Sequence, residues 1–548
     1  MELSSLSRLS TLTLQVSSDG WFKENFVFPE LQRYVIFVNN GYERWQGLAG
    51  LAFRTLEIKK LSSSLSELKN LFYNVEELRL EEVNELTYLR LESWDERKTP
   101  VFSDLIILDL NSLPDLERIW ELESSCSATA TLQNLKEVTI EDCHKLKVIF
   151  PPCLAQSMLQ LQKLYIYNCN GLEQVIGFAQ EKEITENHYP LCCPQLKAVE
   201  ITGCERLKYV FSTNTLSRGL LPLESVELWD CPQLIQVFRP TEERDIIGHR
   251  FLLNLPSLRK LTVINCPKLE CFIVQSQQME ELVLNNVGSG CQLCRIGNQD
   301  CMVVGNHEEV FQVQGGLYSF SSIKVVNLQN LCEVRIIWKD LGGVVTLDNL
   351  TTLCLCDCKR LRYVFTPSTA RSLSRLVNLY ITTCEELEGI ILGMDQVPSS
   401  SNALQPITFP NLTHIEVKKC NNLKSLLPLG SATSLQQLKH LEVESNMKLE
   451  QLFEAKEEIK FDKLKMLELA DMPCLIDFCP KGYHFVFSSL EGLGVRRCPK
   501  MTAGFFIDSK QIVHYKTEKE TSETTPNAIH DKNIYWGKGE DMLRSWEE

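Results

Sequence analysis

The chain has 548 residues, a hydrophobic content of 44% and a formal net charge of −15 at pH 7. The acidic excess argues against a nucleic-acid partner, because binding to the phosphate backbone needs clustered Lys and Arg. No stretch reaches the roughly 18 consecutive apolar residues of a membrane-spanning helix, and the N-terminal residues lack the basic and apolar regions of a secretory signal.

A leucine pattern recurs from Leu9 to the C-terminal region. Its full form, L-x-x-L-x-L-x-x-C-x-x-L-x-x-V-F, begins at Leu135 and again, with small changes, at Leu161 and Leu350. Self-similarity of this length predicts a leucine-rich-repeat solenoid. About 18 units begin at Leu9, Leu31, Phe53, Val75, Leu105, Leu135, Leu161, Leu196, Leu223, Leu258, Met279, Ile323, Leu350, Leu376, Leu412, Leu438, Leu464 and Leu490.

The pattern also predicts how each unit folds. Alternate residues of a strand point to the same side, so Val138 and Ile140 face inward while their neighbours face outward. Stacked strands then form a curved parallel sheet on the concave face. The L-x-x-V-F segment carries the chain to the back, where irregular loops and short helices are expected on the convex face. The expected fold is therefore an α/β leucine-rich-repeat solenoid.

Nine of the 22 cysteines share one repeat position, directly after the strand. A residue that recurs with the structural period is a packing element, and a free Cys behaves as a small buried hydrophobe with a weak S–H donor. We expect reduced thiols and a cytoplasmic protein. The nine are Cys143, Cys169, Cys204, Cys231, Cys266, Cys358, Cys384, Cys420 and Cys498.

Asparagine also occupies special positions in the repeats. Asn39 and Asn446 replace the recurring Cys, where an amide can satisfy backbone groups. Two sequons, at Asn349 and Asn411, lie directly before the first Leu of a repeat. We expect both to be turn residues without a sugar.

Two segments depart from the repeat pattern. Residues 288–320 form an irregular insertion, and residues 513–548 are polar enough to predict a disordered C-terminal tail. The domain boundaries that follow are 1–512 for the solenoid and 513–548 for the tail.

No motif for catalysis or cofactor binding is present in the sequence. It contains no G-x-x-x-x-G-K-[ST] loop, no G-x-G-x-x-G and no H-E-x-x-H. Cys291, Cys294, Cys301 and His307 are four possible zinc ligands, but their spacing fits no strong template, and incidental thiols in a Cys-rich chain explain them better. We expect neither an enzyme, nor a cofactor, nor a metal site.

The function is then expected on the outward side chains of the concave face. Tyr165 and Tyr167 lie on one predicted strand, Glu200 on the next, and Glu227 and Trp229 on the one after. Exposed Tyr and Trp are typical anchors of protein interfaces, although aromatic residues also suit strands in general.

A second group on the same face is acidic. Its members come from three successive predicted strands, and Lys418, Lys419, Arg496 and Arg497 are basic neighbours. Charged residues on a solvated face need no partner, but a protein of complementary charge could bind here. The acidic group consists of Glu416, Glu442, Glu444 and Glu468.

Two segments carry a more specific resemblance. CHKLKVIFPPCLAQSMLQLQKLYIYNCNGLEQVI (143–176) and CKRLRYVFTPSTARSLSRLVNLYITTCEELEGII (358–391) resemble the C-terminal repeats of plant coiled-coil, nucleotide-binding, leucine-rich-repeat disease resistance proteins. The resemblance covers about residues 1–505. It implies a protein-recognition scaffold of an intracellular immune receptor, which senses a pathogen effector or a guarded host protein and restrains the nucleotide-binding domain. The phosphate loop of that domain has no counterpart here, so nucleotide binding transfers to no residue of this sequence.

Two other classes of repeat protein remain as alternatives. A substrate adaptor of a ubiquitin ligase should show an F-box-like helical segment near its start, whereas residues 1–50 already read as repeats. A cell-surface receptor should show a signal peptide, capping Cys pairs and L-x-G-x-I-P repeats, and the sequence has none of these. The immune-receptor interpretation is favoured, with the adaptor or another protein-binding scaffold second.

Overall fold

The computed structural model describes residues 8–16, 31–39, 53–61, 65–68, 71–90, 101–121, 132–151, 154, 158–176, 193–212, 221–239, 252–289, 301–313, 320–340, 345–392, 407–427, 435–453, 461–478, 484–501, 504–516 and 534–537. The chain divides into two compact units, Met1–Glu270 and Cys271–Glu548.

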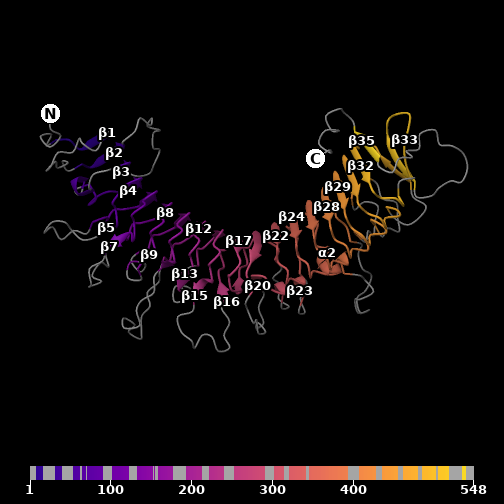
Figure 1. Ribbon diagram of the computed structural model, residues 1–548, viewed down its shortest axis with the longest axis horizontal. Coiled ribbons are helices and arrows are strands. Elements are labelled where there is room, and N and C mark those ends of the chain that lie inside the picture. The colour runs from indigo at the N-terminus through magenta and orange to yellow at the C-terminus, as the bar shows by residue number, and fades with distance from the viewer. Residues whose placement is uncertain are drawn as a thin grey trace, which may run out of the picture. The chain divides into compact units, whose positions relative to one another are not determined.

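A long parallel sheet runs through the first unit (Figure 1). Each strand pairs in register with the equivalent strand of the next repeat, so Leu108 lies opposite Val138, and Val138 lies opposite Leu164. The described residues of this unit contribute ten strands to the sheet: β1 (Thr11–Val16), β2 (Arg33–Asn39), β3 (Arg54–Lys59), β4 (Glu77–Glu81), β6 (Ile107–Asn111), β8 (Glu137–Glu141), β10 (Lys163–Tyr167), β12 (Ala198–Thr202), β14 (Ser225–Trp229) and β17 (Lys260–Cys266).

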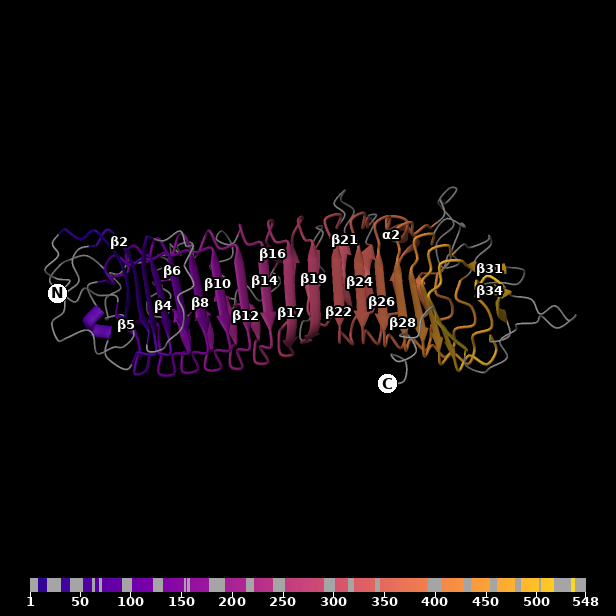
Figure 2. The same cartoon turned by 90° about the horizontal axis from the view of Figure 1, so that it is seen from above.

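The second unit repeats this arrangement, with neighbouring strands side by side (Figure 2). Its described strands pair in parallel from β19 to β32, and the last one, β35, pairs antiparallel with β32. The nine strands are β19 (Glu281–Val287), β22 (Val325–Gln329), β24 (Thr352–Cys356), β26 (Asn378–Thr382), β28 (His414–Lys418), β29 (His440–Glu444), β30 (Met466–Ala470), β32 (Gly492–Arg496) and β35 (Ile534–Gly537).

The core consists of the inward residues of these strands. Val138 and Ile140 are both fully buried, as are Leu441 and Val443. Because the register brings each inward residue against its equivalent in the next repeat, every strand is buried by its two neighbours. Each such side chain contributes roughly 1.5–3 kcal/mol on burial, so stability is shared between repeats and no repeat is stable alone. The predicted leucine-rich-repeat solenoid is confirmed.

The back of each unit differs in detail from the expectation of loops and short helices. The V-F segments form short strands, because β-branched and aromatic residues favour extended backbone. Those of the first unit are β5 (Leu89–Arg90), β7 (Trp120–Glu121), β9 (Val148–Phe150), β11 (Gln174–Ile176), β13 (Tyr209–Ser212) and β15 (Gln236–Arg239); those of the second include β18 (Phe272–Gln275), β23 (Ile336–Asp340), β25 (Tyr363–Phe365) and β27 (Gly389–Ile391). Segments between repeats add β16 (Leu252–Asn254), β20 (Cys301–Val304) and β21 (Glu309–Val313) to the sheet that contains β18 and β23.

Helical structure is sparse among the residues that the structure describes. The 3₁₀ helix η3 (Leu65–Leu68) and the α-helix α2 (Pro367–Ala370) are each a single turn. Pro367 suits the first helical position of α2, and the Thr366 side chain accepts a hydrogen bond from the Thr369 N–H at its start. In the part of the chain that the structure describes, no helix has the length and apolar character to cross a membrane.

A left-handed residue ends the strand in one repeat after another. It directly precedes the recurring Cys position and has φ between 48° and 67°. Asn, Asp and Gly tolerate this conformation best, and they occupy it at Asp142, Asn168, Gly203 and Asp230, for example. The sharp turn that it makes buries the next residue behind the sheet.

The recurring thiols are hydrogen-bonded within this turn. Cys143 Sγ lies 3.3 Å from the carbonyl oxygen of Glu141, and Cys498 Sγ lies 3.3 Å from that of Arg496. All described cysteines are free thiols. Burial raises the pKa of the Cys498 thiol to about 11, which keeps it protonated and unreactive near neutral pH. The prediction of a buried packing position is therefore confirmed.

Asn446 shows what the Cys position requires. Its side chain is fully buried, its Nδ2 donates to the carbonyl oxygens of Val417 and Glu444 at 3.0 Å each, and its Oδ1 accepts from the Cys420 N–H at 2.8 Å. The amide thus satisfies three backbone groups of two neighbouring repeats. The side chain of Asn39 lies outside the described residues.

The two sequon asparagines also connect repeats. Asn349 Nδ2 donates to the carbonyl oxygen of Ser321 at 2.6 Å, and Asn411 Nδ2 donates to that of Ser374 at 2.7 Å. In both cases the nitrogen that would carry a sugar binds the backbone of the preceding repeat. This geometry supports the interpretation of both residues as structural.

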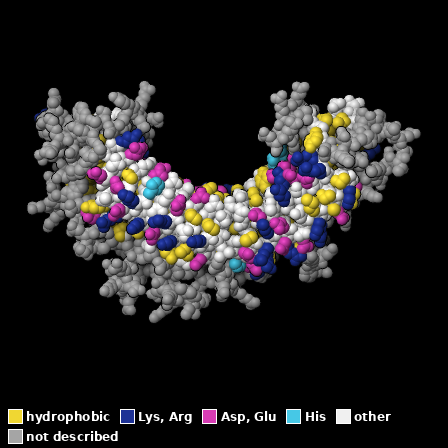
Figure 3. Space-filling model, in the orientation of Figure 1, with side chains coloured by type: hydrophobic (Ala, Val, Ile, Leu, Met, Phe, Trp, Pro, Cys, Tyr) yellow, Lys and Arg dark blue, Asp and Glu magenta, His cyan; other side chains and the backbone are white. Residues whose placement is uncertain are grey.

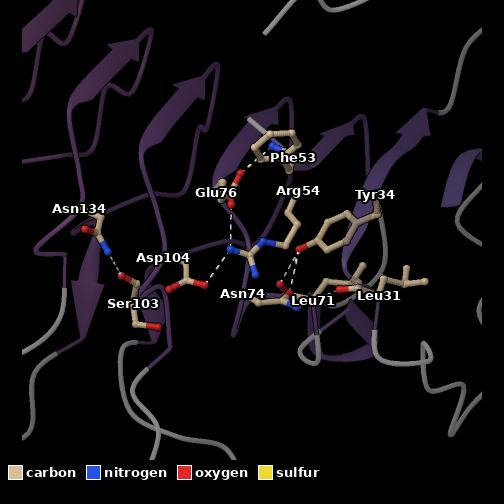
Figure 4. A network of polar contacts seen from close by, with 10 residues as sticks. All are labelled: Leu31, Tyr34, Phe53, Arg54, Leu71, Asn74, Glu76, Ser103, Asp104 and Asn134. Atoms are coloured by element: carbon tan, nitrogen blue, oxygen red, sulfur yellow. Dashed lines mark hydrogen bonds and ion pairs between the residues drawn. The ribbon is translucent and has the colours of Figure 1, made fainter. Parts of the chain in front are cut away.

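A polar network joins the first repeats at the start of their strands (Figure 4). Arg54 Nη2 contacts Glu76 Oε1 at 2.8 Å and Asp104 Oδ2 at 2.9 Å. The Tyr34 hydroxyl donates to the carbonyl oxygen of Leu71 at 3.0 Å, and burial raises its pKa well above the ordinary value. The network fixes the register of β2, β3 and β4 by polar contacts as well as by packing.

The segment 288–320 is more regular than expected. Strand β20 pairs antiparallel with β18 and with β21, and β21 continues in parallel with β23. Cys301 is buried in β20, and His307 Nδ1 accepts from the Glu309 N–H at 3.2 Å. Cys291 and Cys294 lie outside the described residues. Within the described ranges, no group of three or more His, Cys, Asp and Glu side chains is placed to hold a metal ion.

Part of the expected disordered tail is structured. Strand β34 (Val513–Lys516) pairs antiparallel with β31 (His484–Phe487) and β33 (Phe505–Ile507), and Tyr515 packs against Phe478 and Phe505. Strand β35 pairs with β32. These two stretches differ from the expectation, because Val513 and Tyr515 are buried and alternate with polar residues in β34, and Ile534 is buried in β35. Residues 517–533 and 538–548 lie outside the described residues.

Candidate functional site

The outward side chains of the long sheet form rows across the repeats. In L-x-x-L-x-L, the residue between the two inward positions faces outward, and so does the residue after them. The parallel register aligns these positions from strand to strand at a spacing of about 4.8 Å. Side chains far apart in the sequence therefore become neighbours on one surface.

Five predicted residues form one group in the first unit, named here the aromatic–acidic patch. Tyr165 on β10 lies opposite Glu200 on β12, which lies opposite Glu227 on β14. In the adjacent row, Tyr167 and Trp229 lie on either side of Thr202. All five predicted side chains are half-buried, so their rings and carboxylates remain accessible from the open side of the sheet. The patch consists of Tyr165, Tyr167, Glu200, Glu227 and Trp229.

The carboxylates give the patch a negative local field. Burial raises the pKa of Tyr167 to about 12, with further contributions from the charge of Glu200 and a hydrogen bond to it. Burial also raises the pKa of Tyr165. Both phenols therefore stay protonated at neutral pH, and they present neutral, hydrogen-bonding rings beside negative charge.

Two residues beside the patch were not predicted from the sequence. Lys260 on β17 forms an ion pair with Glu227 at 2.9 Å, and Ile264 on the same strand lies opposite Trp229. Both could have been predicted from the repeat that begins at Leu258, because its offsets place Lys260 and Ile264 in outward positions. The patch therefore continues onto a fourth strand.

The acidic group of the second unit is arranged differently from the expectation. Glu416, Glu442 and Glu468 lie opposite one another on β28, β29 and β30. Glu444 belongs instead to the neighbouring row, between Lys418 and Ala470. It is two residues after Glu442 on the same strand, and the row position follows from that offset.

Basic residues neutralise much of this row. Lys418 Nζ contacts Glu416 at 3.0 Å and Glu442 at 2.7 Å, and Arg496 Nη2 contacts Glu468 at 2.8 Å. Over the face visible in Figure 3, Lys and Arg side chains are interspersed with Asp and Glu in the same way. The surface is therefore mixed in charge and not uniformly acidic.

Glu468 is the most buried member of the row. Its side chain is only 8% exposed. Burial and the nearby carboxylate of Glu442 raise its pKa to about 7, although Arg496 acts in the opposite direction. Of the other basic neighbours, Arg497 pairs with Asp471 at the turn, with Arg497 Nη2 2.6 Å from Asp471 Oδ2.

A histidine pair beside this row was also not predicted from the sequence. The rings of His414 and His440 lie opposite each other on β28 and β29, with centroids 4.5 Å apart. Burial lowers the pKa of His414, and the charge of His440 adds to this effect. Both residues occupy the outward position before the first inward residue, so the repeat offsets alone could have paired them.

This arrangement defines a class of protein. A core built from in-register leucines, with outward side chains in rows on an accessible sheet, is a leucine-rich-repeat scaffold for protein interaction. Its outward rows offer shape, charge and aromatic contact area, which are the elements of a protein interface.

The family is shown by a comparison of sequences. The model for the leucine-rich repeats of plant disease resistance proteins of the RPS2-like type matches residues 48–170, 174–289, 242–385 and 395–448, which together exceed half of the chain. The chain belongs to this family of plant disease resistance repeats. A comparison with curated proteins found no match to the sequence.

Solved structures of leucine-rich-repeat proteins are only distantly similar. The functional domain of InlJ from Listeria monocytogenes, which includes a cysteine ladder, is 11% identical over 85% of this chain and 85% of that chain, with a TM-score of 0.35. TLR13 in complex with ssRNA13 is 14% identical over 77% of this chain and 58% of that chain, with a TM-score of 0.29. Similarity at this level has no bearing on partner or function.

Proposed function

We propose that this chain is the protein-recognition scaffold of a plant intracellular immune receptor, acting in the cytoplasm in disease resistance. Its partner is a pathogen effector or a guarded host protein, and in a larger receptor it also contacts the nucleotide-binding domain. Membership of the disease resistance repeat family supports this role. The work of the scaffold is binding.

The observation that carries the proposal is the aromatic–acidic patch. Tyr and Trp supply large contact areas at low entropic cost and dominate many protein interfaces. Here three such rings lie on β10 and β14, beside Glu200 and Glu227. A partner that presents apolar side chains flanked by Lys or Arg complements this surface in both shape and charge.

The experiment compares proteins captured from plant cells by the wild-type chain and by a variant with Tyr165, Tyr167 and Trp229 changed to Ala. These side chains face away from the core, so the variant should fold. We expect it to lose one or more specific partners, because truncating an interface anchor typically weakens binding at least tenfold. Proximity labelling followed by quantitative mass spectrometry measures the difference.

A matched control changes Tyr209 and Tyr363 to Ala. Both are half-exposed rings on the back strands β13 and β25, so their loss should leave the captured proteins unchanged. An unchanged partner set for the patch variant would remove the patch from the proposal. Recovery of ubiquitin-ligase subunits as the main partners would favour the adaptor function instead.

A further inference from the structure

Two rings of the aromatic–acidic patch are separated by a small residue. Tyr167 on β10 and Trp229 on β14 lie in the same outward row, with Thr202 of β12 between them. Thr202 is half-buried, so the two rings leave part of it open. By contrast, Thr262, an outward threonine on β17, is only 2% exposed. The space above Thr202, between the rings of Tyr167 and Trp229, is named here the aromatic slot.

The width of the aromatic slot suits one planar group. Tyr167 and Trp229 are two strands apart, so their backbones are separated by about 9–10 Å. A flat group stacked between two rings needs ring planes about 7 Å apart, which is twice the contact distance between carbon atoms. A modest inclination of the rings toward each other gives this spacing. The slot therefore has room for a single planar side chain.

A carboxylate lies beside the slot. Glu200 is two residues before Thr202 on the same strand, so it also faces outward. It accepts a hydrogen bond from the Tyr167 hydroxyl, and this bond contributes to the raised pKa of that phenol. A carboxylate has about four acceptor positions, so Glu200 is held beside the first ring and still has room for another donor.

Glu200 is also the carboxylate of the patch without a cation. Glu227 is paired with Lys260 at 2.9 Å, and Glu137, on the neighbouring strand β8, is paired with Lys163 at 3.1 Å. Within the described part of the chain, no ion pair includes Glu200. One negative charge is therefore left uncompensated at the side of the aromatic slot.

We propose that the aromatic slot binds an arginine side chain of the partner protein. This inference rests on the proposed function and names the group that the patch recognises. A guanidinium is planar and stacks on aromatic rings, whereas the ammonium of Lys is a compact, strongly hydrated charge. Its N–H groups also bind a carboxylate through two parallel hydrogen bonds. Between Tyr167 and Trp229 it is stacked on both faces, and its edge is beside Glu200.

The first experiment needs no mutation. Saturation-transfer difference NMR on the full-length chain compares three probes, the Nα-acetyl methylamides of arginine, lysine and citrulline. Citrulline has nearly the shape of arginine but no charge. We expect the arginine probe to bind with half-saturation in the millimolar range. The other two should bind roughly fivefold more weakly, because lysine lacks the planar cation and citrulline lacks the charge.

Two variants then locate the binding site. Glu200→Gln removes the charge with little change of shape, and Trp229→Leu removes one ring. Each should weaken binding of the arginine probe roughly tenfold, because each removes one of the two interactions that favour a guanidinium. The matched control carries Glu137→Gln and Lys163→Gln, which together remove a neighbouring ion pair without changing the net charge, and it should bind the probe as wild type does.

Three results would overturn the proposal. The first is equal binding of the arginine and citrulline probes to wild type, which can be measured even if a variant fails to fold. The second is arginine binding that a folded Glu200→Gln or Trp229→Leu variant leaves unchanged, because the probe would then occupy another site. The third is binding that the matched control weakens as much as Glu200→Gln does. Circular dichroism verifies that each variant is folded.

The capture experiment on plant cells distinguishes this proposal from the proposed function. If the variant of Tyr165, Tyr167 and Trp229 loses partners while the arginine probe fails the tests above, the proposed function stands and the arginine assignment is wrong. If the probe binds as expected while the captured partners are unchanged, the patch has no role in recognition, and the assignment to a partner's arginine is wrong as well.

Discussion

At the scale of single residues, the repeat depends on a few backbone groups that must be satisfied at the end of each strand. The thiol of the recurring Cys is a weak donor, and the amide of Asn446 makes stronger bonds at the same place. The residue before it adopts a left-handed conformation whether or not its side chain favours it. The contribution of these two positions to the free energy of unfolding therefore differs from repeat to repeat.

Replacing Asn446 tests the first position. In Asn446→Leu, the Cys420 N–H and the carbonyl oxygens of Val417 and Glu444 lose their buried partner, and we expect a loss of about 2 kcal/mol in the free energy of unfolding. Asn446→Cys should lose less, because it restores the residue used by neighbouring repeats. Urea unfolding followed by circular dichroism measures both, and equal stability of the two variants would contradict the argument.

Thr383 tests the second position. It has φ 56°, although a β-branched residue is strained there. Thr383→Asn should raise the free energy of unfolding by about 1 kcal/mol, because Asn tolerates this conformation at lower cost. The control is Thr382→Asn on the extended strand β26, which should be neutral or slightly destabilising. If only Thr382→Asn raised the free energy of unfolding, the left-handed turn would not be the source of the stabilisation.

At the scale of elements, the long strands combine a buried row with outward rows whose charges interact across repeats. Glu468 shows the result, since its pKa of about 7 arises from burial on β30 and from Glu442 on β29. No single strand contains this interaction, because it exists only when the two strands are paired.

The pH dependence follows from that pKa. The unfolded carboxyl titrates near 4.5, and the folded one near 7. The folded chain thus binds more protons between these values, and the stabilisation that the protonated form provides is lost as pH rises through about 7. Glu468→Gln cannot ionise at this position. As the pH rises from about 5 to about 8, the urea midpoint of unfolding of the wild type should therefore fall relative to that of Glu468→Gln. A difference that is constant with pH would contradict this, and Glu444→Gln on the neighbouring row is the control.

At the scale of the whole molecule, each repeat depends for its stability on contacts with its neighbours. The inward side chains lie opposite the equivalent residues before and after them, and each strand pairs with the strands of the adjacent repeats. Damage to one repeat should therefore remain local and fade with the number of repeats crossed.

A cavity in the first unit tests this locality. Leu164 is 1% exposed on β10, and Leu164→Ala should cost about 2–5 kcal/mol locally. Hydrogen exchange should accelerate in β8, β10 and β12, and remain unchanged in β26 and β28. Tyr165→Ala, one residue away but facing outward, is the control and should alter exchange much less. Uniform acceleration across the chain would mean that it unfolds as one cooperative body.

Much of this architecture could be predicted from the spacing of residues. The positions of the long strands, their inward pairs such as Val138 and Ile140, and the burial of the recurring thiols all follow from a local repeat that each unit contains in full. The association of Tyr165 with Glu200 and Glu227 also follows, because a parallel in-register stack leaves equivalent positions only one way to align.

The sequence by itself determined the repeat, its core and the kind of surface that it displays. The tertiary structure alone decided the raised pKa of Glu468 and the pairing of β35 with β32. The physical reason is the range of the interactions involved. A repeat encodes its own burial pattern, whereas ion pairing, desolvation and strand addition at an edge depend on which residues from distant repeats come within contact.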